Sequence, residues 1–513
     1  MVGSVLVAVL LAVTGCSAGG TTGGSAAGGS RHLSGAGGAG HGAAPGAEEA
    51  RAGTAGWRIA EGAVASDVQL SAFADQTSVR PGESVRVFAS TDAAQVRVRA
   101  LRMGWYAGLE AREVWSSARL AGRRQGGRLL DRGTGAVYVD WQPTVSVSTS
   151  GWPEGFYLLR LDTSAGRSRY IPLVVRSADA RGRVALMAEV NTYQAYNTWG
   201  GRDLYAGEDG KRGSRSSAVS FDRPYDGNGA VKYFAFEDPL VHRAARLNLP
   251  LAYTTDVQLD HDPALLNGAL GLVSLGHDEY WTPAMRAHAT TARDAGSNLA
   301  FLGANAIYWR VRYAPTALGK DRLMIGYKSL SDPIAGKEPA STTVRFRDPP
   351  AADPENGLVG QLYECFPASG AYVVQDPGFF LFRGTGARAG MSFPGLVGIE
   401  SDRAYPLAST PRPLQVVARG PMRCGRTTST HTSVYYTVPS GAGVFSIGTL
   451  GWVLALRGPR PSRGVDQAGS DFVRTVTDNL LREMAAGPMG RRHPAVDNLA
   501  EQHLGTRNST GSA

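Results

Sequence analysis

Short runs in which apolar and polar residues alternate dominate residues 57–178. Residues 85–89, 96–101 and 137–141 show this pattern, and residues 155–161 and 170–175 are further strand candidates. Alternation with a period of two is typical of a strand with one buried face. Turn residues such as Pro81 and Gly82 separate the runs. Several short strands with regular breaks predict an N-terminal immunoglobulin-like β-sandwich over residues 57–178.

From residue 181 the pattern changes to continuous apolar runs, at residues 183–188, 249–256, 270–276 and 298–305. Helical spacing lies between them, at about 231–247 and 283–295. Continuous apolar strands that alternate with helices predict a parallel sheet covered on both faces. Residues 313–437 read as a β-rich insertion, and residues 443–448 return as a strand. A closing helix is predicted at 471–486, where Phe472, Val473, Val476, Leu480 and Leu481 have helical spacing. The sequence therefore predicts an α/β domain over residues 181–487.

The two ends of the chain predict export and disorder. Residues 1–16 are largely apolar and end in Val13-Thr14-Gly15-Cys16, which resembles a bacterial lipoprotein signal whose cysteine is lipidated. An ordinary secretory signal is the alternative, and a transmembrane helix is disfavoured because the run is well short of about 20 residues. Residues 17–56 are rich in Gly, Ala and Ser, which predicts a flexible tether, and residues 488–513 predict a disordered tail. We expect an extracytoplasmic protein that is anchored to the cell membrane by a lipid on Cys16.

Composition narrows the possible partners. The 513 residues allow two or three domains, and the net charge of +9 comes from arginines spread along the chain. This dispersion argues against a nucleic-acid partner and suits an anionic cell envelope. With Cys16 assigned to the lipid, Cys365 and Cys424 remain, and an oxidising compartment predicts a disulfide between them. Such a bridge could stabilise the fold by about 4 kcal/mol; two separate buried thiols are the alternative.

Polar and aromatic residues follow the predicted parallel strands. Ligands bind beyond the carboxyl ends of the strands in open parallel sheets, so a small-molecule or glycan ligand is expected there. The candidate substrate-binding residues are Asn191, Tyr193, Tyr196, Asn197, Trp199, Asp256, Trp281, Asn305 and Trp309.

The motif Gly276-His277-Asp278-Glu279-Tyr280-Trp281 carries the densest chemistry. We expect His277, Asp278 and Glu279 to be catalytic, with His277 as a general base near neutral pH. Tyr280 is a candidate oxygen ligand to a hard metal ion. The alternative is helix capping by Asp278 or Thr282 before Pro283, and both interpretations can hold together.

Three motifs together resemble a known family. They are Asn191 to Gly201, Gly276 to Trp281 and Phe301 to Trp309, and they look like the catalytic domain of the large subunit of N,N-dimethylformamidase and its uncharacterised relatives. The resemblance covers roughly residues 183–487, and the preceding sandwich fits the uncharacterised relatives. It implies a glutamine-amidotransferase-like (flavodoxin-like) parallel α/β domain, amide hydrolysis, and a mononuclear iron held by two tyrosines and a glutamate; another divalent metal ion is the alternative.

The resemblance carries over to some residues and not to others. Tyr280 matches a family tyrosine, whereas Asp278 stands where the family has proline. Phe236 and its neighbours stand where a second tyrosine is expected, so Tyr193 or Tyr196 would have to replace it. For the carboxylate ligand we select Glu400, for which a salt-bridged loop is the alternative.

Two functions remain from the sequence. The first is an envelope-anchored, metal-dependent hydrolase that cleaves an amide or a similar C–N bond. The second is a non-catalytic binding protein, in which Trp199, Trp281, Trp309 and Trp452 would stack on sugar rings. Outside the export region the chain has no GxSxG, and it has no HExxH or P-loop motif, which removes those enzyme classes.

Overall fold

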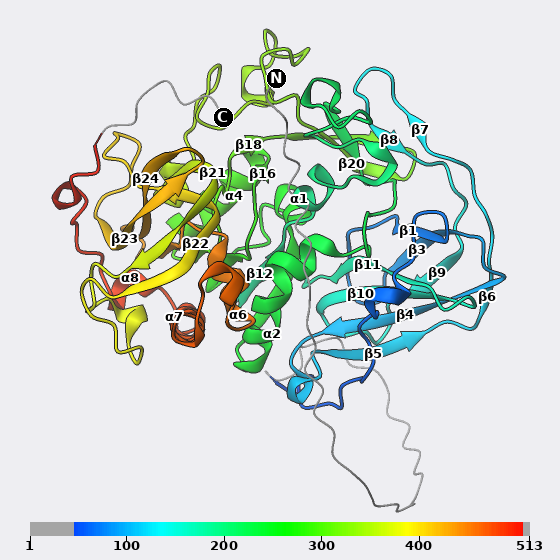
Figure 1. The fold of residues 1–513 in the computed structure, drawn as a ribbon, viewed down its shortest axis with the longest axis horizontal. Coiled ribbons are helices and arrows are strands. Elements are labelled where there is room, and N and C mark those ends of the chain that lie inside the picture. Colours follow the sequence, from blue (N-terminus) through cyan, green and yellow to red (C-terminus); the bar gives the residue numbers. More distant parts are fainter. Residues whose placement is uncertain (1–45, 506–513) are drawn as a thin grey trace, which may run out of the picture. The chain divides into compact units, whose positions relative to one another are not determined.

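The structure is a computed structural model that describes residues 46–505 (Figure 1). All the described residues belong to one compact unit. The predicted signal at 1–16 with Cys16, and the predicted tether as far as residue 45, lie outside the described residues. Among those described, no helix combines the length and the hydropathy needed to cross a membrane.

The N-terminal region contains two main sheets whose apolar faces share a core. In each sheet apolar side chains alternate with polar ones, as the sequence predicts; Val85, Val98 and Leu159 are among those buried between them. The first sheet is antiparallel and consists of β1 (Leu70–Ala74), β3 (Ser84–Thr91) and β9 (Val145–Ser148). The second consists of β2 (Ser78–Val79), β11 (Ser168–Val175), β10 (Gly155–Thr163), β4 (Gln95–Met103) and β5 (Ala111–Ser116), with β6 (Leu120–Ala121) beside β4.

The predicted strand at 137–141 is shorter than expected. It forms β8 (Val137–Tyr138), which pairs with β7 (Leu129–Leu130) outside both main sheets.

A mixed nine-stranded sheet dominates the rest of the chain (Figure 1). Its first five strands are parallel: β14 (Leu251–Thr255), β12 (Val184–Ala188), β15 (Gly271–Ser274), β17 (Asn298–Phe301) and β25 (Gly443–Ser446). The antiparallel strands β24 (Thr427–Thr437), β23 (Leu414–Cys424), β21 (Leu362–Val373) and β22 (Ser392–Arg403) continue it.

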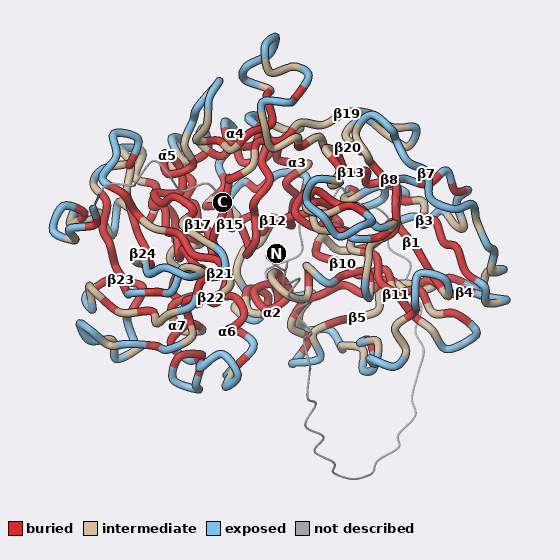
Figure 2. The backbone as a smooth tube through the Cα atoms, turned by 45° about the horizontal axis from the view of Figure 1, so that its top comes forward, coloured by how far each residue is buried: buried red, intermediate tan, exposed pale blue. Residues whose placement is uncertain are grey.

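Helices cover both faces of the parallel strands, as the continuous apolar runs predict. Leu186 of β12 packs in one core with α2 (Asp238–Arg246), α6 (Gly451–Leu456) and α7 (Gln467–Ala485). Met187, the next residue, packs in the other core with α3 (Asp256–His261) and α4 (Pro283–Asp294). Buried residues therefore run along the whole length of β12, β15, β17 and β25 (Figure 2). The fold class is α/β, with more strand than helix and with both antiparallel and mixed sheets.

Two predicted helices are confirmed, α4 with both ends and α7 with an additional turn before the predicted start at residue 471. Thr282 caps α4, since its Oγ1 accepts a hydrogen bond from the Met285 amide at 3.1 Å, and Pro283 takes the first helical position. α7 begins at residue 467 after the cap Asp466. The predicted helix at 231–247 consists of a π-helical turn, η5 (Tyr233–Glu237), followed by α2.

The segment 313–437 is β-rich, as predicted, and lies in the chain between the neighbouring strands β17 and β25. Its strands β21 to β24 extend the main sheet, and β19 (Arg312–Thr316) and β20 (Gly319–Ile325) pair with β13 (Ala218–Ser220) in a small sheet. The remaining elements are the ribbon β16 (Tyr280–Trp281) with β18 (Trp309–Arg310), and the short helices α1 (Val190–Ala195), α5 (Asn356–Val359) and α8 (Met489–Arg492).

Both predicted disordered ends contain ordered residues. Residues 488–505 carry α8 and pack on the sheet through the buried Met489, Leu499 and Leu504. Residues 46–56 are also described, and Glu49 is paired with the buried Arg102 at 2.7 Å. The disorder predicted for these two stretches from their small and polar residues is wrong, because a few side chains per segment suffice to anchor them.

Candidate active site

The candidate residues gather where the order of the parallel strands reverses. β14 and β15 flank β12 on opposite sides, and connections in opposite directions leave a crevice at the carboxyl end of such strands. Glu189 follows β12 there, and the motif from Gly276 to Glu279 follows β15. The predicted position of the site is therefore the edge at which these residues meet.

The carboxylate of Glu279 is the centre of a cluster of phenols. Tyr196 donates a hydrogen bond to Oε2 at 2.7 Å, and Tyr205 donates to Oε1 at 2.7 Å and to Oε2 at 2.8 Å. Tyr280 in turn donates to the Tyr205 hydroxyl at 2.5 Å. Burial, followed by the charge of Glu279, raises the pKa of all three phenols. The cluster holds its protons firmly at neutral pH.

Two lysines border this cluster. Lys328 donates from Nζ to the Tyr280 hydroxyl at 2.7 Å, and its Nζ lies 3.5 Å from the centre of the Tyr205 ring and 5.0 Å from that of Trp309. Lys232 places its Nζ 3.9 Å from the centre of the Tyr196 ring. Burial lowers the pKa of both lysines, that of Lys328 to about 7. The cations face aromatic rings and phenol oxygens, which attract them.

His277 lies between two carboxylates. Its Nε2 is 3.5 Å from Glu279 Oε2 and 3.3 Å from Glu400 Oε2. Glu400 reaches this place although its strand β22 is the edge of the nine-stranded sheet. The strand turns back over the end of β25, where the Asp402 amide donates to the Gly448 carbonyl at 2.9 Å. Asp402 also accepts from the Asn305 amide at 2.9 Å, and burial raises the pKa of its carboxyl to about 8.

A layer of buried carboxyl groups supports the loops of the site. Glu189 accepts a hydrogen bond from the Gly276 amide at 2.7 Å, and Glu237 accepts from the Glu189 amide at 2.9 Å. Asp256 accepts from the Asn191 amide at 2.8 Å. Burial raises the pKa of these carboxyls and of Asp278, and the charge of Asp278 raises the pKa of Glu189 further. The structure places Asp278 in this supporting layer.

The phenol cluster fits the metal site that the family resemblance implies. Among the described residues, no three His, Cys, Asp or Glu side chains are arranged to hold a metal ion. Tyr196, Tyr205 and Glu279 supply two tyrosines and one glutamate in one place, and oxygen ligands suit hard metal ions. Of the two predicted metal ligands, Tyr280 adjoins Tyr205 and Glu400 adjoins His277.

Sequence reasoning missed Tyr205 and Lys328. Tyr205 comes four residues after Gly201, just past a recognised motif, and this closeness was the available signal. Lys328 follows β20 of the small sheet, so nothing in its local sequence indicates that it joins the site. The position expected to hold a second tyrosine is occupied by Phe236, whose ring packs against His277 with centres 5.4 Å apart.

The other candidate binding residues have structural partners. Asn191 Nδ2 donates to the Tyr280 carbonyl at 3.1 Å and so positions the motif. Asn197 Nδ2 donates to the Pro224 carbonyl at 2.8 Å, and Tyr193 bonds Glu237 in the supporting layer. Trp309 is the candidate tryptophan beside Lys328.

Three of the four tryptophans proposed for sugar stacking are buried elsewhere. Trp199 donates from Nε1 to Ser71 Oγ at 3.1 Å and packs edge-on against Trp141 of the N-terminal region. Trp281 packs on Phe301 in the core, and Trp452 donates to Thr477. Their burial leaves these rings no free face for a ligand.

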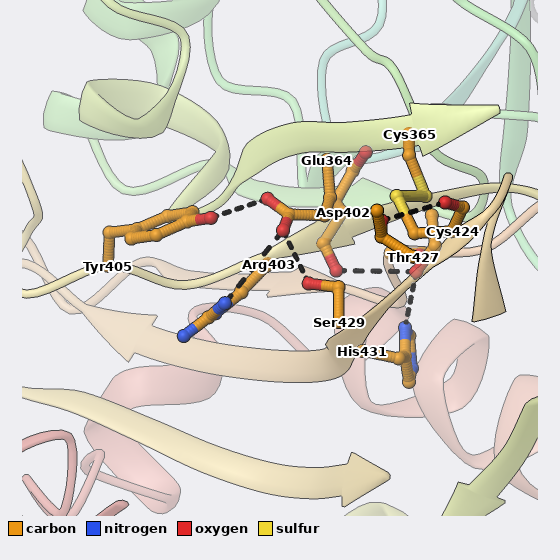
Figure 3. The surroundings of a disulfide bond; sticks show 11 residues. Glu364, Cys365, Asp402, Arg403, Tyr405, Cys424, Thr427, Ser429 and His431 are labelled. Carbon is orange, nitrogen blue, oxygen red and sulfur yellow. Dashed lines mark hydrogen bonds and ion pairs between the residues drawn. A yellow bond between two sulfur atoms is a disulfide. The ribbon is translucent and has the colours of Figure 1, made fainter. Parts of the chain in front are cut away.

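The predicted disulfide joins Cys365 and Cys424 and ties β21 to β23 (Figure 3). Beside it, Glu364 accepts a hydrogen bond from Tyr405 at 2.5 Å and another from Ser429. Since β21 pairs with β22, with Tyr363 opposite Asp402, the bridge braces the strands that carry Glu400.

Fold and site together define an α/β protein with a buried cluster of phenols, carboxyls and ammonium groups at the strand-order reversal of its main sheet. The family model for the N,N-dimethylformamidase beta subunit-like C-terminal domain matches residues 97–467, and the chain belongs to that family. The match begins in β4, so it includes much of the N-terminal region as well as the segment from residue 183 that the motifs indicate.

No curated protein matches the chain. Among solved structures, a cycloisomaltooligosaccharide glucanotransferase of Paenibacillus sp. complexed with cycloisomaltoheptaose is similar over 25% of this chain and 18% of its own, with 14% identity and a TM-score of 0.15.

Proposed function

We propose that this protein is a metal-dependent hydrolase that cleaves an amide or a related C–N bond. The carrying observation is the convergence of Tyr196 and Tyr205 on Glu279, supported by the relation to a formamidase family. These three residues would hold mononuclear iron or another divalent ion. When bound, such an ion polarises a carbonyl oxygen and lowers the pKa of a bound water.

The chain's own residues supply orientation and proton transfer. Lys328 and Tyr280 present an ammonium and a hydroxyl side by side, as donors to a substrate oxygen. His277 lies within reach of both Glu279 and Glu400 and can carry a proton between them. Burial of these groups keeps bulk water away, which strengthens each of these interactions.

Metal content and activity together test this proposal. A protein of residues 46–505 would be purified without added metal and analysed for bound metals. It would then be assayed on a panel of small formamides and acetamides. We expect stoichiometric metal and amide hydrolysis, both lost in Tyr196→Phe and Tyr205→Phe. Tyr157→Phe is the matched control, because that buried phenol donates to a backbone carbonyl in the N-terminal region.

The outcomes separate the parts of the proposal. Hydrolysis without metal would overturn the metal dependence and keep the reaction. Metal that remains in both cluster variants would overturn the ligand set. If the protein contains no metal and hydrolyses no amide, but binds a small molecule or glycan in a saturable manner, the result favours the non-catalytic ligand-binding alternative.

We further propose that the protein is anchored outside the cytoplasm by a lipid on Cys16. The support is the sequence Val13-Thr14-Gly15-Cys16 after an apolar run. In cells, Cys16→Ser should move the protein from the membrane fraction to the soluble fraction or leave an uncleaved precursor, and no change in either would contradict the anchor.

We also infer the finer fold class. The parallel strands have the order second, first, third, fourth, fifth, which is the flavodoxin-like order; this supports a glutamine-amidotransferase-like domain. The two packed N-terminal sheets support an immunoglobulin-like sandwich. An experimental structure superposed on representatives of both folds tests this inference.

A further inference from the structure

Three positively charged side chains connect the candidate active site with the surface. Lys328 donates from Nζ to the Tyr280 hydroxyl at 2.7 Å. Arg215 is half-buried, and its Nη2 donates to the carbonyl of Tyr327, the residue before Lys328, at 3.2 Å. Arg212 is exposed, and its carbonyl accepts from Arg215 Nη1 at 3.2 Å. The row therefore runs from the phenol cluster, through a half-buried guanidinium, to a side chain in solvent.

The three cations lie close enough to act on one another. Burial lowers the pKa of Arg215, and the positive charge of Arg212 lowers it further. Burial also lowers the pKa of Lys328 to about 7, and the charge of Glu279 opposes this shift. The charges of Arg215 and Arg212 add to the shift at Lys328. Mutual repulsion of this kind requires that the three charges converge on one side of the site.

No carboxylate compensates the two arginines. Neither Arg212 nor Arg215 forms an ion pair with a described acidic residue, whereas Arg202 pairs with Glu208 at 3.1 Å in the same loop region. Asp203, whose charge reaches Lys328, is occupied by two backbone amides of its own loop, each at 2.7 Å. Positive charge at the rim of the site thus remains available to an external anion.

We propose that the substrate of this site is an amide that also carries a carboxylate, which Arg215 binds with Arg212 beside it. This inference rests on the proposed function, because it concerns the same site. Arg215 spends two of its five N–H groups on carbonyls, which leaves three for a charge-assisted bond to a carboxylate. The carboxylate stays at the arginines, away from the negative Glu279, while the amide reaches Lys328. The exposed Arg212 attracts the anion toward the site.

Formate release from paired substrates tests this specificity. The anions are N-formylglycine, N-formyl-β-alanine and N-formyl-4-aminobutyrate, which differ in the spacing of amide and carboxylate, and each is compared with its neutral carboxamide. With the protein of residues 46–505, we expect kcat/KM of the best anion to exceed that of its neutral partner by about 10-fold to 100-fold at low salt. The ratio should fall at high salt, since exposed charges are screened.

Variants assign the preference to Arg215. Arg215→Gln should bring the ratio of anion to neutral partner close to one, and Arg215→Lys should retain part of it. Arg97→Gln is the matched control, because it removes one charge from an exposed position of β4 and should preserve the ratio. Equal kcat/KM within every pair of the unaltered protein, or a preference that persists in Arg215→Gln, would overturn the proposal.

Binding separates this inference from the proposed hydrolysis. Isothermal titration calorimetry on the same pairs requires no turnover. If no amide is cleaved, the hydrolase fails, yet tighter binding of the anions that is lost in Arg215→Gln still supports the carboxylate site, and equal binding of both members overturns it. Hydrolysis of the neutral and anionic members at equal rates keeps the hydrolase and overturns only the present inference.

Discussion

At the scale of single residues, the charge of Lys328 distinguishes this site. An ammonium within 2.7 Å of the Tyr280 hydroxyl and 3.5 Å of the Tyr205 ring centre adds a positive charge to a cluster built around Glu279. With its pKa lowered to about 7, the protonated form of Lys328 places this charge in advance where negative charge develops on a substrate oxygen. The backbone of Lys328 has a φ of 60°, in the left-handed region, and the surrounding fold holds it in that conformation.

We expect Lys328→Met to lower kcat/KM for any amide that the protein hydrolyses by about 10²–10³-fold, the usual cost of removing one donor to a developing charge. Steady-state kinetics would measure it, with circular dichroism to verify the fold. Lys320→Met is the control, because that side chain is 78% exposed. An unchanged kcat/KM would remove Lys328 from the reaction.

Glu237 allows a test of the supporting carboxyl layer. Its pKa is raised by burial, to about 8, so the folded protein loses stability as pH rises from the ordinary value near 4.5 and stops losing it above the raised value. Glu237→Gln removes this loss. The variant should match the wild type at pH 4.5 and exceed it by about 1–3 kcal/mol at pH 8, measured by urea unfolding. A gain that is independent of pH would show that Glu237 does not titrate in this way.

At the scale of elements, the disulfide connects strands that are far apart in the chain. Cys365 and Cys424 are separated by 59 residues, and closing such a loop restricts the unfolded chain. We expect the double variant Cys365→Ser, Cys424→Ser to lose about 2–4 kcal/mol of unfolding free energy. Dithiothreitol should cause the same loss in the wild type and none in the variant. Sensitivity of the variant to dithiothreitol would refute this explanation.

The sequence predicts elements whose signals are local and misses contacts between distant elements. α4 has a cap at Thr282, a proline at its first position and a periodic apolar face, and all three lie within a few residues. The alternation in β3 and β4 is equally local. By contrast, Glu400 meets His277 because an edge strand turns back over the sheet, and Lys328 arrives from the small sheet beside it. Neither path leaves a periodic signal in the chain. The sequence therefore indicated Glu400 as a candidate without its contact to His277, and it missed Lys328.

At the scale of the whole described chain, the N-terminal region and the main sheet share buried contacts. Arg102 of β4 contacts Glu49, the Tyr106 hydroxyl at 2.7 Å and the Tyr253 hydroxyl of β14 at 3.5 Å. Trp199 lies in a small core with Phe73 and Phe88. Residues 46–56 therefore belong to the folded body.

A chain shortened to begin at residue 57 would lose Glu49 and leave Arg102 buried without its carboxylate. Removing one partner of a buried ion pair costs about 3–5 kcal/mol, so we expect a clear fall in melting temperature relative to a chain that begins at residue 46. Glu49→Gln in the longer chain should reproduce much of this fall, and equal melting temperatures for all three would contradict the role of the pair.

The return of β22 over the end of β25 has a consequence for the order of folding. The residues of the candidate site come from positions between 189 and 402, and Glu400 depends on pairing across most of the nine-stranded sheet. Contacts so distant in sequence form late, after local helices and neighbouring strands have gathered. A refolding chain should thus become compact and bury its tryptophans before it regains ligand binding. The delay between the change in tryptophan fluorescence and the return of ligand binding would measure how long β22 takes to pair with the sheet.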